Sequence, residues 1–497
     1  MQIDWSTDEP SSAAGQLWVV PVRKDDDPST IEDRFGAHVH AAATAARFAG
    51  KPSDAFAFTR EVDGTLQHVV LLGVGAGIDK PAALRQLGHD AARRAEQVGA
   101  SHLVVDLRGE DVTALDDDPA HAGDLFAQGA ELGTYVYDRF RSEDKRKPSS
   151  LRTATVVATT TAPAEGTTRG QVIAAAVARA RDLGNGPAEL VTPTFLADTA
   201  REIVDALSGE HDVSLQVFDR AECGRRNMGC YLGVAKGSDE EPRFIHLQYK
   251  PKGKSRGRVA LVGKGVTFDS GGYSIKPTDG MLDMKMDMCG SAAVIGAFEG
   301  AVKLGLDYEL HVLVAATENM VSGHAYRLGD VLTASNGKTV EINNTDAEGR
   351  LTLADALVYA GKLEPDFIID FATLTGACIV ALGPKIAGVM TNDEKLWTDW
   401  SGAADRVGDR MWRLPLPEDL KEQLDSKIAD MKNTGERWGG ALTAGLFLSE
   451  FTEGQRWMHV DIAGPAMASK PHGITTPGAS GFPVATILEL LSGDVAE

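Results

Sequence analysis

The segment from Asn344 to Arg350 (NTDAEGR) holds two carboxylates, a glycine and an arginine. In an extended segment the side chains of residues i and i+2 point to the same face, so Asp346 and Glu348 can reach one site. Carboxylate oxygens are ligands of hard and borderline divalent cations. Gly349 would let the backbone turn, and the guanidinium of Arg350 could hold an oxyanion by two hydrogen bonds. The segment predicts a metal-binding loop, with a surface turn of scattered charge as the alternative.

A second group of ionisable residues follows an apolar stretch. Residues 259–263 (VALVG) are typical of a buried strand, and the glycine-rich loop after such a strand often carries functional groups. Charged side chains are almost never buried without compensation, and a pair of divalent metals would compensate them. Three carboxylates and a fourth from Asp283 or Asp287 could bridge two metals about 3.5–4 Å apart, and spacing does not choose between these two residues. The ionisable residues of this group are Lys264, Asp269, Lys276, Asp283 and Asp287.

These motifs resemble the leucyl aminopeptidase family, also called the cytosol aminopeptidase family. The resemblance runs in order from about residue 180 to about residue 490 and is weaker upstream. The segments that carry it are GKGVTFDSGG (263–272), KP (276–277), MKMDM (284–288) and NTDAEGR (344–350), with RDLGN (181–185), ENM (318–320), AYR (325–327), ATLTGA (372–377), KNTG (432–435) and HVDIAG (459–464).

The resemblance implies a site for two metal ions. Its ligands would be Lys264, Asp269, Asp287, Asp346 and Glu348, with Asp269 and Glu348 bridging the two ions. A lysine ligand must be neutral because an ammonium has no lone pair, whereas residue type alone would make Lys264 a salt-bridge partner. Carboxylate oxygens and a lysine nitrogen suit Mn²⁺ or Zn²⁺, and also Mg²⁺ or Co²⁺, so the metal stays open.

The implied reaction is hydrolysis of the N-terminal peptide bond of short peptides by a metal-bridging water. Lys276 would stay charged and stabilise the oxyanion, an interaction worth about 3–4 kcal/mol in other enzymes. Arg350 would hold a bicarbonate that acts as the general base. None of the twelve His falls in the metal motifs, and His459 is expected to be a core residue of a strand.

The same resemblance assigns a pocket for the N-terminal side chain. The pocket is apolar, so the implied preference is for leucine and other hydrophobic residues, while Cys-Gly dipeptidase activity stays open. Ala466 lies near a position that can hold a larger side chain, which leaves the depth of the pocket open. The residues that carry over to the pocket are Met284, Thr373, Leu374, Gly376 and Ala463.

Two other classes of function are alternatives. A different metal hydrolase, such as an amidase or a phosphoesterase, could use the same carboxylates without needing a free α-amine. A non-catalytic binding protein could keep the fold, but degenerate ligands would mark it, and here the ligand and catalytic positions are intact. Motifs of zincin proteases, serine hydrolases and P-loop nucleotide binders are absent. The formal net charge of −21, from 50 basic and 71 acidic side chains, disfavours nucleic acid as a partner.

Length and composition predict a cytoplasmic enzyme of two or three domains. Of the 497 residues, 43% are hydrophobic and 24% are charged, which is ordinary for a globular enzyme. No apolar stretch approaches about 18 residues, and the first residues lack the pattern of a signal peptide. The four Cys contain no C-x-x-C spacing and are expected to be reduced. Cys289, close to Asp287, could perturb the metal preference, but packing is the favoured interpretation.

Strand and helix patterns alternate along the whole chain, which predicts an α/β fold. We expect an N-terminal α/β domain over residues 1–162, a connecting helix over 163–185 and a larger catalytic α/β domain over 186–497. The catalytic domain should contain a mixed, largely parallel sheet flanked by helices, with the catalytic groups at strand ends. The family resemblance implies a homohexamer. Strands are predicted at 16–22, 68–74, 102–107, 153–160, 212–218, 258–263, 309–315, 366–371 and 457–462, and a helix at 81–98.

Overall fold

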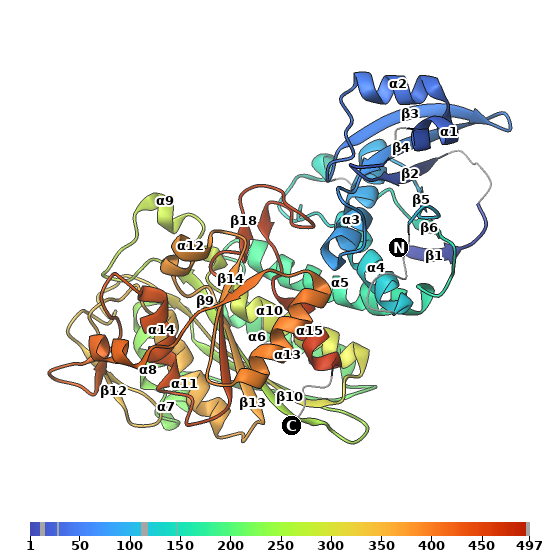
Figure 1. Cartoon of the computed structure of the whole chain (residues 1–497). Coiled ribbons are helices and arrows are strands. Elements are labelled where there is room, and N and C mark those ends of the chain that lie inside the picture. Colours follow the sequence, from blue (N-terminus) through green and yellow to red (C-terminus); the bar gives the residue numbers. More distant parts are fainter. Residues whose placement is uncertain (10–14, 27–28, 111–117, 147, 494–497) are drawn as a thin grey trace. The chain divides into compact units, whose positions relative to one another are not determined.

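The computed structural model describes residues 1–9, 15–26, 29–110, 118–146 and 148–493. The chain forms two compact units, one of Met1–Ala175 with His472–Ile474 and one of Ala176–Pro471 with Thr475–Glu497 (Figure 1). Both units are built from strands and helices, so the predicted α/β class is confirmed. Helix α5 (Ala164–Asn185) contributes residues to both units. No helix of the described ranges has the length and hydrophobicity needed to cross a membrane.

The first unit contains a six-stranded sheet in the order β1-β6-β5-β2-β4-β3. Its neighbouring strands pair in parallel except for β3, which is antiparallel to β4. The sequence predicted β2, β4, β5, β6 and α3, but it missed β1 and β3, which lie at the two edges. Exposed and partly exposed residues alternate along β3, so it lacks the apolar run that marks a buried strand. The elements are β1 (Gln2–Ser6), β2 (Gln16–Val22), α1 (Ser29–Phe35), α2 (Ala37–Ala45), β3 (Ala55–Val62), β4 (Thr65–Gly73), α3 (Pro81–Val98), β5 (His102–Asp106), α4 (Pro119–Gly133) and β6 (Thr153–Val157).

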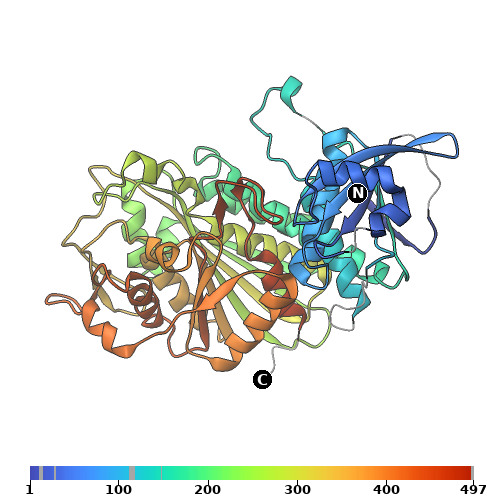
Figure 2. The ribbon, with the colours of Figure 1, turned by 45° about the horizontal axis from the view of Figure 1, so that its top comes forward.

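The second unit contains an eight-stranded mixed sheet in the order β15-β14-β17-β13-β9-β10-β8-β7. Its four central strands β17, β13, β9 and β10 are parallel, and β14, β8 and β7 pair antiparallel with their inner neighbours. Figure 2 shows these strands side by side between helices. The strands are β7 (Asp212–Phe218), β8 (Arg243–Lys250), β9 (Gly257–Asp269), β10 (Tyr308–Asn319), β13 (Phe367–Ala372), β14 (Ala387–Thr391), β15 (Met411–Arg413) and β17 (Trp457–Asp461).

Helices cover this sheet on two sides. In one group, α10 contacts α6 and α15, and α15 contacts α13. In the other group, α11 contacts α8 and α14. Two small sheets, β11-β12-β16 and β18-β19, lie outside the main one. The helices are α6 (Pro193–Leu207), α7 (Arg220–Arg225), α8 (Gly229–Val234), α9 (Thr278–Met281), α10 (Cys289–Leu304), α11 (Gly349–Gly361), α12 (Gly376–Leu382), α13 (Glu394–Val407), α14 (Gly440–Ser449) and α15 (Val484–Ser492). The short strands are β11 (Val331–Thr333), β12 (Thr339–Glu341), β16 (Met431–Lys432), β18 (Met467–Ala468) and β19 (Gly478–Ala479).

Helix α10 packs directly onto the sheet at its N-terminus. A Cβ atom on Gly290 would lie 2.0 Å from the carbonyl oxygen of Phe371 in β13, and one on Gly263 would lie 2.6 Å from the Cα of Ser291. The two glycines therefore allow a backbone approach that larger residues would prevent. The approach fixes Asp287, which precedes α10, beside the carboxyl ends of β9 and β13.

A buried ion pair links β13 and β17 in the core of the second unit. Asp370 and His459 are both fully buried, and His459 Nδ1 lies 2.6 Å from Asp370 Oδ1. Trp457 donates its indole N–H to the other oxygen of Asp370 at 2.7 Å. Burial alone would lower the pKa of His459, but the Asp370 carboxylate outweighs burial and raises it above its usual value. The prediction that His459 is a core residue of a strand is confirmed.

This pair should make stability depend on pH. Because the pKa of His459 is raised in the folded state, its contribution is fully present below the unfolded value of about 6.5 and is lost as pH rises through the folded value. We expect His459→Gln to cost about 1–3 kcal/mol at low pH and progressively less at higher pH. Thermal unfolding from pH 5.5 to 9 measures the difference between wild type and variant. The exposed control His324→Gln should show no such trend, and a pH-independent difference for His459→Gln would contradict the prediction.

Candidate active site

The twelve residues that the sequence analysis assigned as metal ligands, catalytic residues or pocket residues all line one cleft of about 550 Å³ in the second unit. The cleft lies where β9, β13 and β17 end. Because these strands are parallel, the polar residues at their carboxyl ends lie at one edge of the sheet. The twelve are Lys264, Asp269, Lys276, Met284, Asp287, Asp346, Glu348, Arg350, Thr373, Leu374, Gly376 and Ala463. Twelve further lining residues had no predicted role, namely Met286, Asn344, Ala347, Thr375, Ala377, Ile379, Thr434, Gly435, Glu436, Arg437, Gly440 and Thr443.

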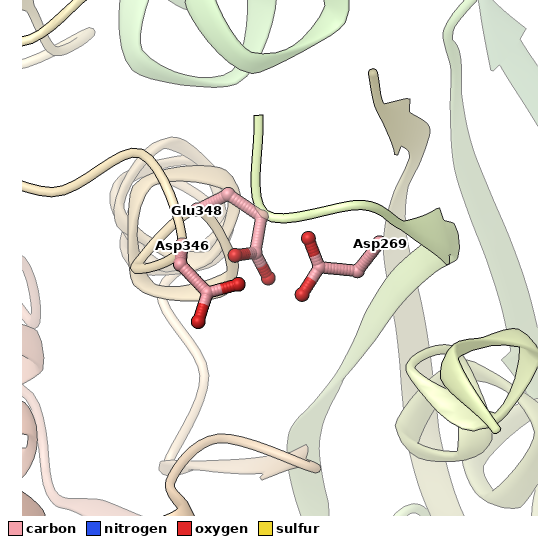
Figure 3. A group of neighbouring side chains, drawn as sticks. All are labelled: Asp269, Asp346 and Glu348. Atoms are coloured by element: carbon pink, nitrogen blue, oxygen red, sulfur yellow. The ribbon is translucent and has the colours of Figure 1, made fainter. Parts of the chain in front are cut away.

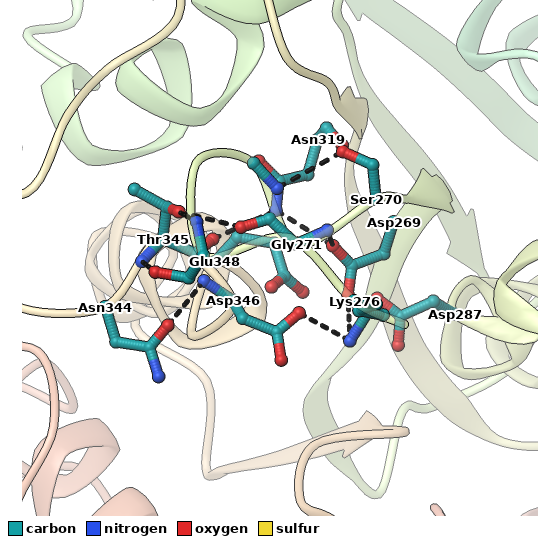
Figure 4. Close-up of polar contacts among 12 residues, drawn as sticks. Asp269, Ser270, Gly271, Lys276, Asp287, Asn319, Asn344, Thr345, Asp346 and Glu348 are labelled. Atoms are coloured by element: carbon teal, nitrogen blue, oxygen red, sulfur yellow. Dashed lines mark hydrogen bonds and ion pairs between the residues drawn. The ribbon is translucent and has the colours of Figure 1, made fainter. Parts of the chain in front are cut away.

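Lys264 and Asp269 lie on β9, and a tight turn follows them. Gly271 and Gly272 have φ of +85° and +62°, a left-handed conformation that glycine adopts without strain. The amide of Lys276 donates to the carbonyl of Ser270 at 3.0 Å and closes the turn. This returns the chain to Asp269, whose Oδ2 lies 2.8 Å from Lys276 Nζ. The same ammonium lies 2.5 Å from Asp346 Oδ1 (Figure 4).

The segment from Asn344 to Arg350 is a turn that enters helix α11, so the expected extended conformation is wrong. Glu348 already has helical angles, with φ −75° and ψ −39°. Asparagine side chains, and not a neighbouring strand, form hydrogen bonds with the backbone of the turn. Asp346 N donates to Asn344 Oδ1 at 2.8 Å, and Asn433 Nδ2 donates to the Asn344 carbonyl at 2.6 Å. The turn brings the carboxylates of Asp346 and Glu348 together as the pattern predicted, although by a different backbone path.

Three carboxylates converge in the cleft. One oxygen from each of Asp269, Asp346 and Glu348 lies within 4.8 Å of the others. Figure 3 shows the three side chains pointing toward one another from the end of β9 and from the start of α11. Such a group of oxygen donors can hold a divalent cation.

Lys264 lies at the bottom of this cluster and is 3% exposed. Its Nζ lies 2.7 Å from Asp287 Oδ1 and 2.9 Å from Glu348 Oε1, and it donates to the Thr373 carbonyl at 3.1 Å. Asp287 is buried, whereas Asp283 is exposed and does not line the cleft. The tertiary structure therefore distinguishes the two carboxylates that spacing could not.

Gly349 has a different role from the one expected. It is the first residue of α11 and needs no special backbone angles. A Cβ atom at this position would lie 2.4 Å from Cε and 2.6 Å from Nζ of Lys264. A larger residue here would displace the end of the Lys264 side chain, because the lysine passes directly against the helix.

Burial and neighbouring charges shift the pKa values of the cluster. Burial raises the pKa of Asp269 to about 6 and raises that of Asp287 well above its usual range. Burial would raise the pKa of Glu348 too, but the ammonium groups of Lys264 and Lys276 outweigh it and lower the value. For Lys264, burial lowers the pKa, but the surrounding carboxylates more than offset it and raise the pKa above its usual value. Without a metal, these carboxylates hold Lys264 as an ammonium.

The donor set fits divalent metal ions. Four carboxylates lie around two ammonium groups, and burial favours the neutral forms of Asp269 and Asp287, whereas a bound cation would favour their ionised forms. In addition, Asp287 Oδ2 and Glu348 Oε2 are buried without a hydrogen-bond partner among the residues described. Buried carboxylate oxygens in this state are costly unless a cation binds them.

Arg350 lies at the other side of the cluster, in the first turn of α11. It is buried, and its Nη1 donates to the Asn433 carbonyl at 2.8 Å, while its Nε has no partner within the described part of the chain. Burial lowers the pKa of Arg350 to about 10. The guanidinium therefore keeps a donor available for an oxyanion.

Asn319, at the end of β10, joins the two metal motifs and was missed as a functional position. Its Nδ2 donates to Asp269 Oδ1 at 2.8 Å and to the Thr345 carbonyl at 3.0 Å (Figure 4). Tyr326 donates its hydroxyl to the same carbonyl at 2.8 Å. Both residues lie in segments that carry the family resemblance, ENM and AYR, but the sequence offered no reason to assign them a role.

The apolar side of the cleft differs from expectation in two places. Met286 lines the cleft together with Met284, although only Met284 was predicted there. Ala466 is buried and does not line the cleft, so it does not form the pocket wall that its position in the sequence suggested.

Cys289 is buried, and burial raises its pKa to about 12, so it packs as a neutral thiol.

Comparison with known families covers most of the chain. Residues 178–488 match the catalytic domain of the cytosol aminopeptidase family, and residues 19–144 match the N-terminal domain of that family. A probable cytosol aminopeptidase of Acaryochloris marina is 45% identical over 437 residues, which cover 86% of each chain. One of Nostoc punctiforme is 40% identical over 496 residues, covering 99% of this chain and 97% of the relative.

Solved structures agree with these matches. A tomato leucine aminopeptidase mutant superposes with a TM-score of 0.88 at 35% identity, covering 99% of this chain and 96% of the other. The bottromycin maturation enzyme BotP in complex with Mn superposes with a TM-score of 0.85 at 33% identity, covering 97% of this chain and 100% of the other.

The contact between Gly349 and Lys264 leads to a prediction. Gly349→Ala should displace the Lys264 amine from Asp287 and Glu348 and weaken metal binding by about 10–100-fold, as disturbed support of metal ligands does elsewhere. Titration of the chelator-treated protein with Mn²⁺, followed by calorimetry, measures this. The control Gly402→Ala adds the same methyl group to helix α13, where nothing lies within 4 Å. Equal affinities for the two variants would show that the close contact has no role in metal binding.

Proposed function

This chain belongs to the cytosol aminopeptidase family and is a metal-dependent aminopeptidase, and we propose that it releases leucine and other hydrophobic residues from short peptides. The observation that carries the proposal is the cleft in which Asp269, Asp346 and Glu348 converge beside the unpartnered oxygens of Asp287 and Glu348. An apolar pocket adjoins these groups in the same cleft. A peptide could thus place its N-terminal side chain in the pocket while its first peptide bond lies over the carboxylates.

The residues that would hold two divalent ions are Lys264, Asp269, Asp287, Asp346 and Glu348. When bound, the ions would polarise the scissile carbonyl and lower the pKa of the attacking water. Lys264 would have to release a proton before it could coordinate, because an ammonium has no lone pair. Mn²⁺ or Zn²⁺ are the proposed ions, with Mg²⁺ or Co²⁺ as alternatives.

Lys276 and Arg350 are the proposed catalytic residues. Burial would lower the pKa of Lys276, but Asp269 and the other carboxylates raise it above the usual value, so its ammonium stays charged at neutral pH. That ammonium can stabilise the oxyanion of the tetrahedral intermediate. The unpartnered Nε of Arg350 can donate to a bicarbonate, the proposed general base.

The proposed pocket for the N-terminal side chain consists of Met284, Thr373, Leu374, Gly376 and Ala463. Its apolar character supports a preference for leucine-like side chains. A difference of one methylene is worth about 1–3 kcal/mol in a hydrophobic pocket, so other apolar residues should also be accepted.

The wider biological role follows the family. We propose peptide turnover in the cytoplasm by a homohexamer, with residues 1–162 as the N-terminal domain, 163–185 as the connecting helix and 186–497 as the catalytic domain. The names of the relatives support the cytoplasmic location, and the two family matches support an N-terminal and a catalytic domain; the homohexamer rests on the family resemblance alone.

Metal removal and a blocked substrate test the activity. Chelator-treated protein should not hydrolyse leucine amide, and added Mn²⁺ or Zn²⁺ should restore the reaction. N-acetyl-leucine amide should not be cleaved, because an aminopeptidase requires the free α-amine. Cleavage of the acetylated substrate would instead indicate a general amidase, and inactivity with every metal would favour a binding role.

The role of Lys276 gives a second test. Lys276→Ala should lower kcat for leucine amide by about 100- to 1000-fold with little change in KM, since the ammonium acts mainly on the charge that develops in the transition state. Lys303→Ala removes a partly exposed lysine of α10 and is the matched control. Steady-state kinetics of the metal-loaded proteins measures both. A Lys276→Ala enzyme with wild-type kcat would exclude this role.

A further inference from the structure

We infer that Asp461 is a positioning residue that joins the walls of the substrate pocket and sets how strictly the enzyme discriminates between N-terminal side chains. Asp461 is the last residue of β17, is fully buried and has no role in the ligand or catalytic set described above. The inference rests on the proposed pocket and adds a residue that controls it.

The carboxylate of Asp461 binds both sides of the pocket. Its Oδ1 accepts the backbone N–H of Leu374 at 3.1 Å and the backbone N–H of Ala463 at 3.1 Å. These two pocket residues follow different strands, β13 and β17, and are separated by almost ninety positions in the sequence. Strand pairing of β13 and β17 ends at Ala372 and Asp461, and this oxygen atom links the two walls directly beyond that point.

The second carboxylate oxygen of Asp461 binds Thr375, at the start of helix α12. The Thr375 hydroxyl donates to Asp461 Oδ2 at 2.7 Å, and its oxygen accepts the backbone N–H of Cys378 at 3.0 Å. Thr375 is thus the N-cap of α12, the helix that begins with the pocket residue Gly376. Asp461 orients this cap and with it the start of the helix.

Thr373, which directly precedes Leu374, contacts the metal cluster. Thr373 donates its hydroxyl to Asp287 Oδ1 at 2.8 Å, and its carbonyl accepts from Lys264 Nζ at 3.1 Å. Consecutive residues are thus anchored to the metal cluster and to Asp461. The Asp461 anchor therefore sets where the side-chain pocket lies relative to the peptide bond that is cleaved.

Hydrogen bonds, and not an ion pair, stabilise this buried charge. Within the described ranges no basic side chain lies within ion-pair distance of Asp461, and three donors converge on its two oxygens. An asparagine has a single acceptor oxygen and cannot accept all three with the same geometry. Asp461→Asn should therefore loosen the walls while it preserves the size of the side chain.

The test compares substrate selectivity in Asp461→Asn and Thr375→Val with a matched control. The control is Asp355→Asn: Asp355 is also fully buried and accepts two backbone N–H groups, from Tyr231 at 2.8 Å and Ser335 at 2.7 Å, but it lies outside the cleft. The readouts are kcat/KM for leucine amide and for alanine amide, the metal content and the thermal midpoint of each protein.

We expect the ratio of kcat/KM for leucine amide over alanine amide to fall about tenfold in both pocket variants, mainly through a higher KM for leucine amide. Their metal content should equal that of wild type. Asp355→Asn should lower the thermal midpoint but keep the selectivity ratio, which separates a role in the pocket from a loss of stability.

A selectivity ratio within twofold of wild type in the folded, metal-loaded Thr375→Val and Asp461→Asn proteins would overturn the inference. If Asp461→Asn does not fold, Thr375→Val alone decides, because it removes the Oδ2 contact and leaves the carboxylate in place. A wild-type enzyme that cleaves N-acetylated substrates would overturn the proposed function itself. An unchanged ratio with normal leucine amide hydrolysis would overturn only the role of Asp461.

Discussion

Compensation of buried negative charge is the constraint on which this structure depends. Four carboxylates and two lysines are brought into one largely buried cleft at the edge of the eight-stranded sheet. Each ammonium lies between two carboxylates, Lys264 between Asp287 and Glu348, and Lys276 between Asp269 and Asp346. Buried charge is tolerated only when it is paired, neutralised by protonation or bound to a metal. Burial favours the neutral forms of Asp269 and Asp287, and a bound cation would favour their ionised forms.

The scaffold meets this constraint by close backbone approach. Glycines at 263, 290 and 349 let the sheet, helix α10 and helix α11 come close enough for Lys264 to lie among the carboxylates. Asn319 and Asn433 satisfy the backbone of the loops, where no neighbouring strand can do so. Such uncharged supporting groups orient ligands without adding charge to the site.

The metal cluster and the substrate pocket share one support. Thr373 contacts the cluster, and Leu374 beside it contacts Asp461, so the two functions are fixed to each other through a single peptide segment. A substrate held in the pocket thereby has a defined position above the carboxylates. Positioning of this kind supplies much of the catalytic advantage of enzymes, and small displacements are costly.

The sequence by itself determined the α/β class, most of the central strands and half of the residues that line the cleft, because buried parallel strands have long apolar runs and the motifs keep the spacing of the family they resemble. It did not determine the path of the segment from Asn344 to Arg350, which is a helix-entry turn and not an extended strand. Residue spacing left Asp283 and Asp287 equivalent; the family resemblance implied Asp287, and the tertiary structure places Asp287 alone of the two in the cleft. Only the tertiary structure revealed the contacts of Asn319 and Asp461. The position of this segment and of these side chains depends on contacts between residues far apart in the chain. Those contacts are decided by the pairing and register of the strands, which local sequence patterns do not encode.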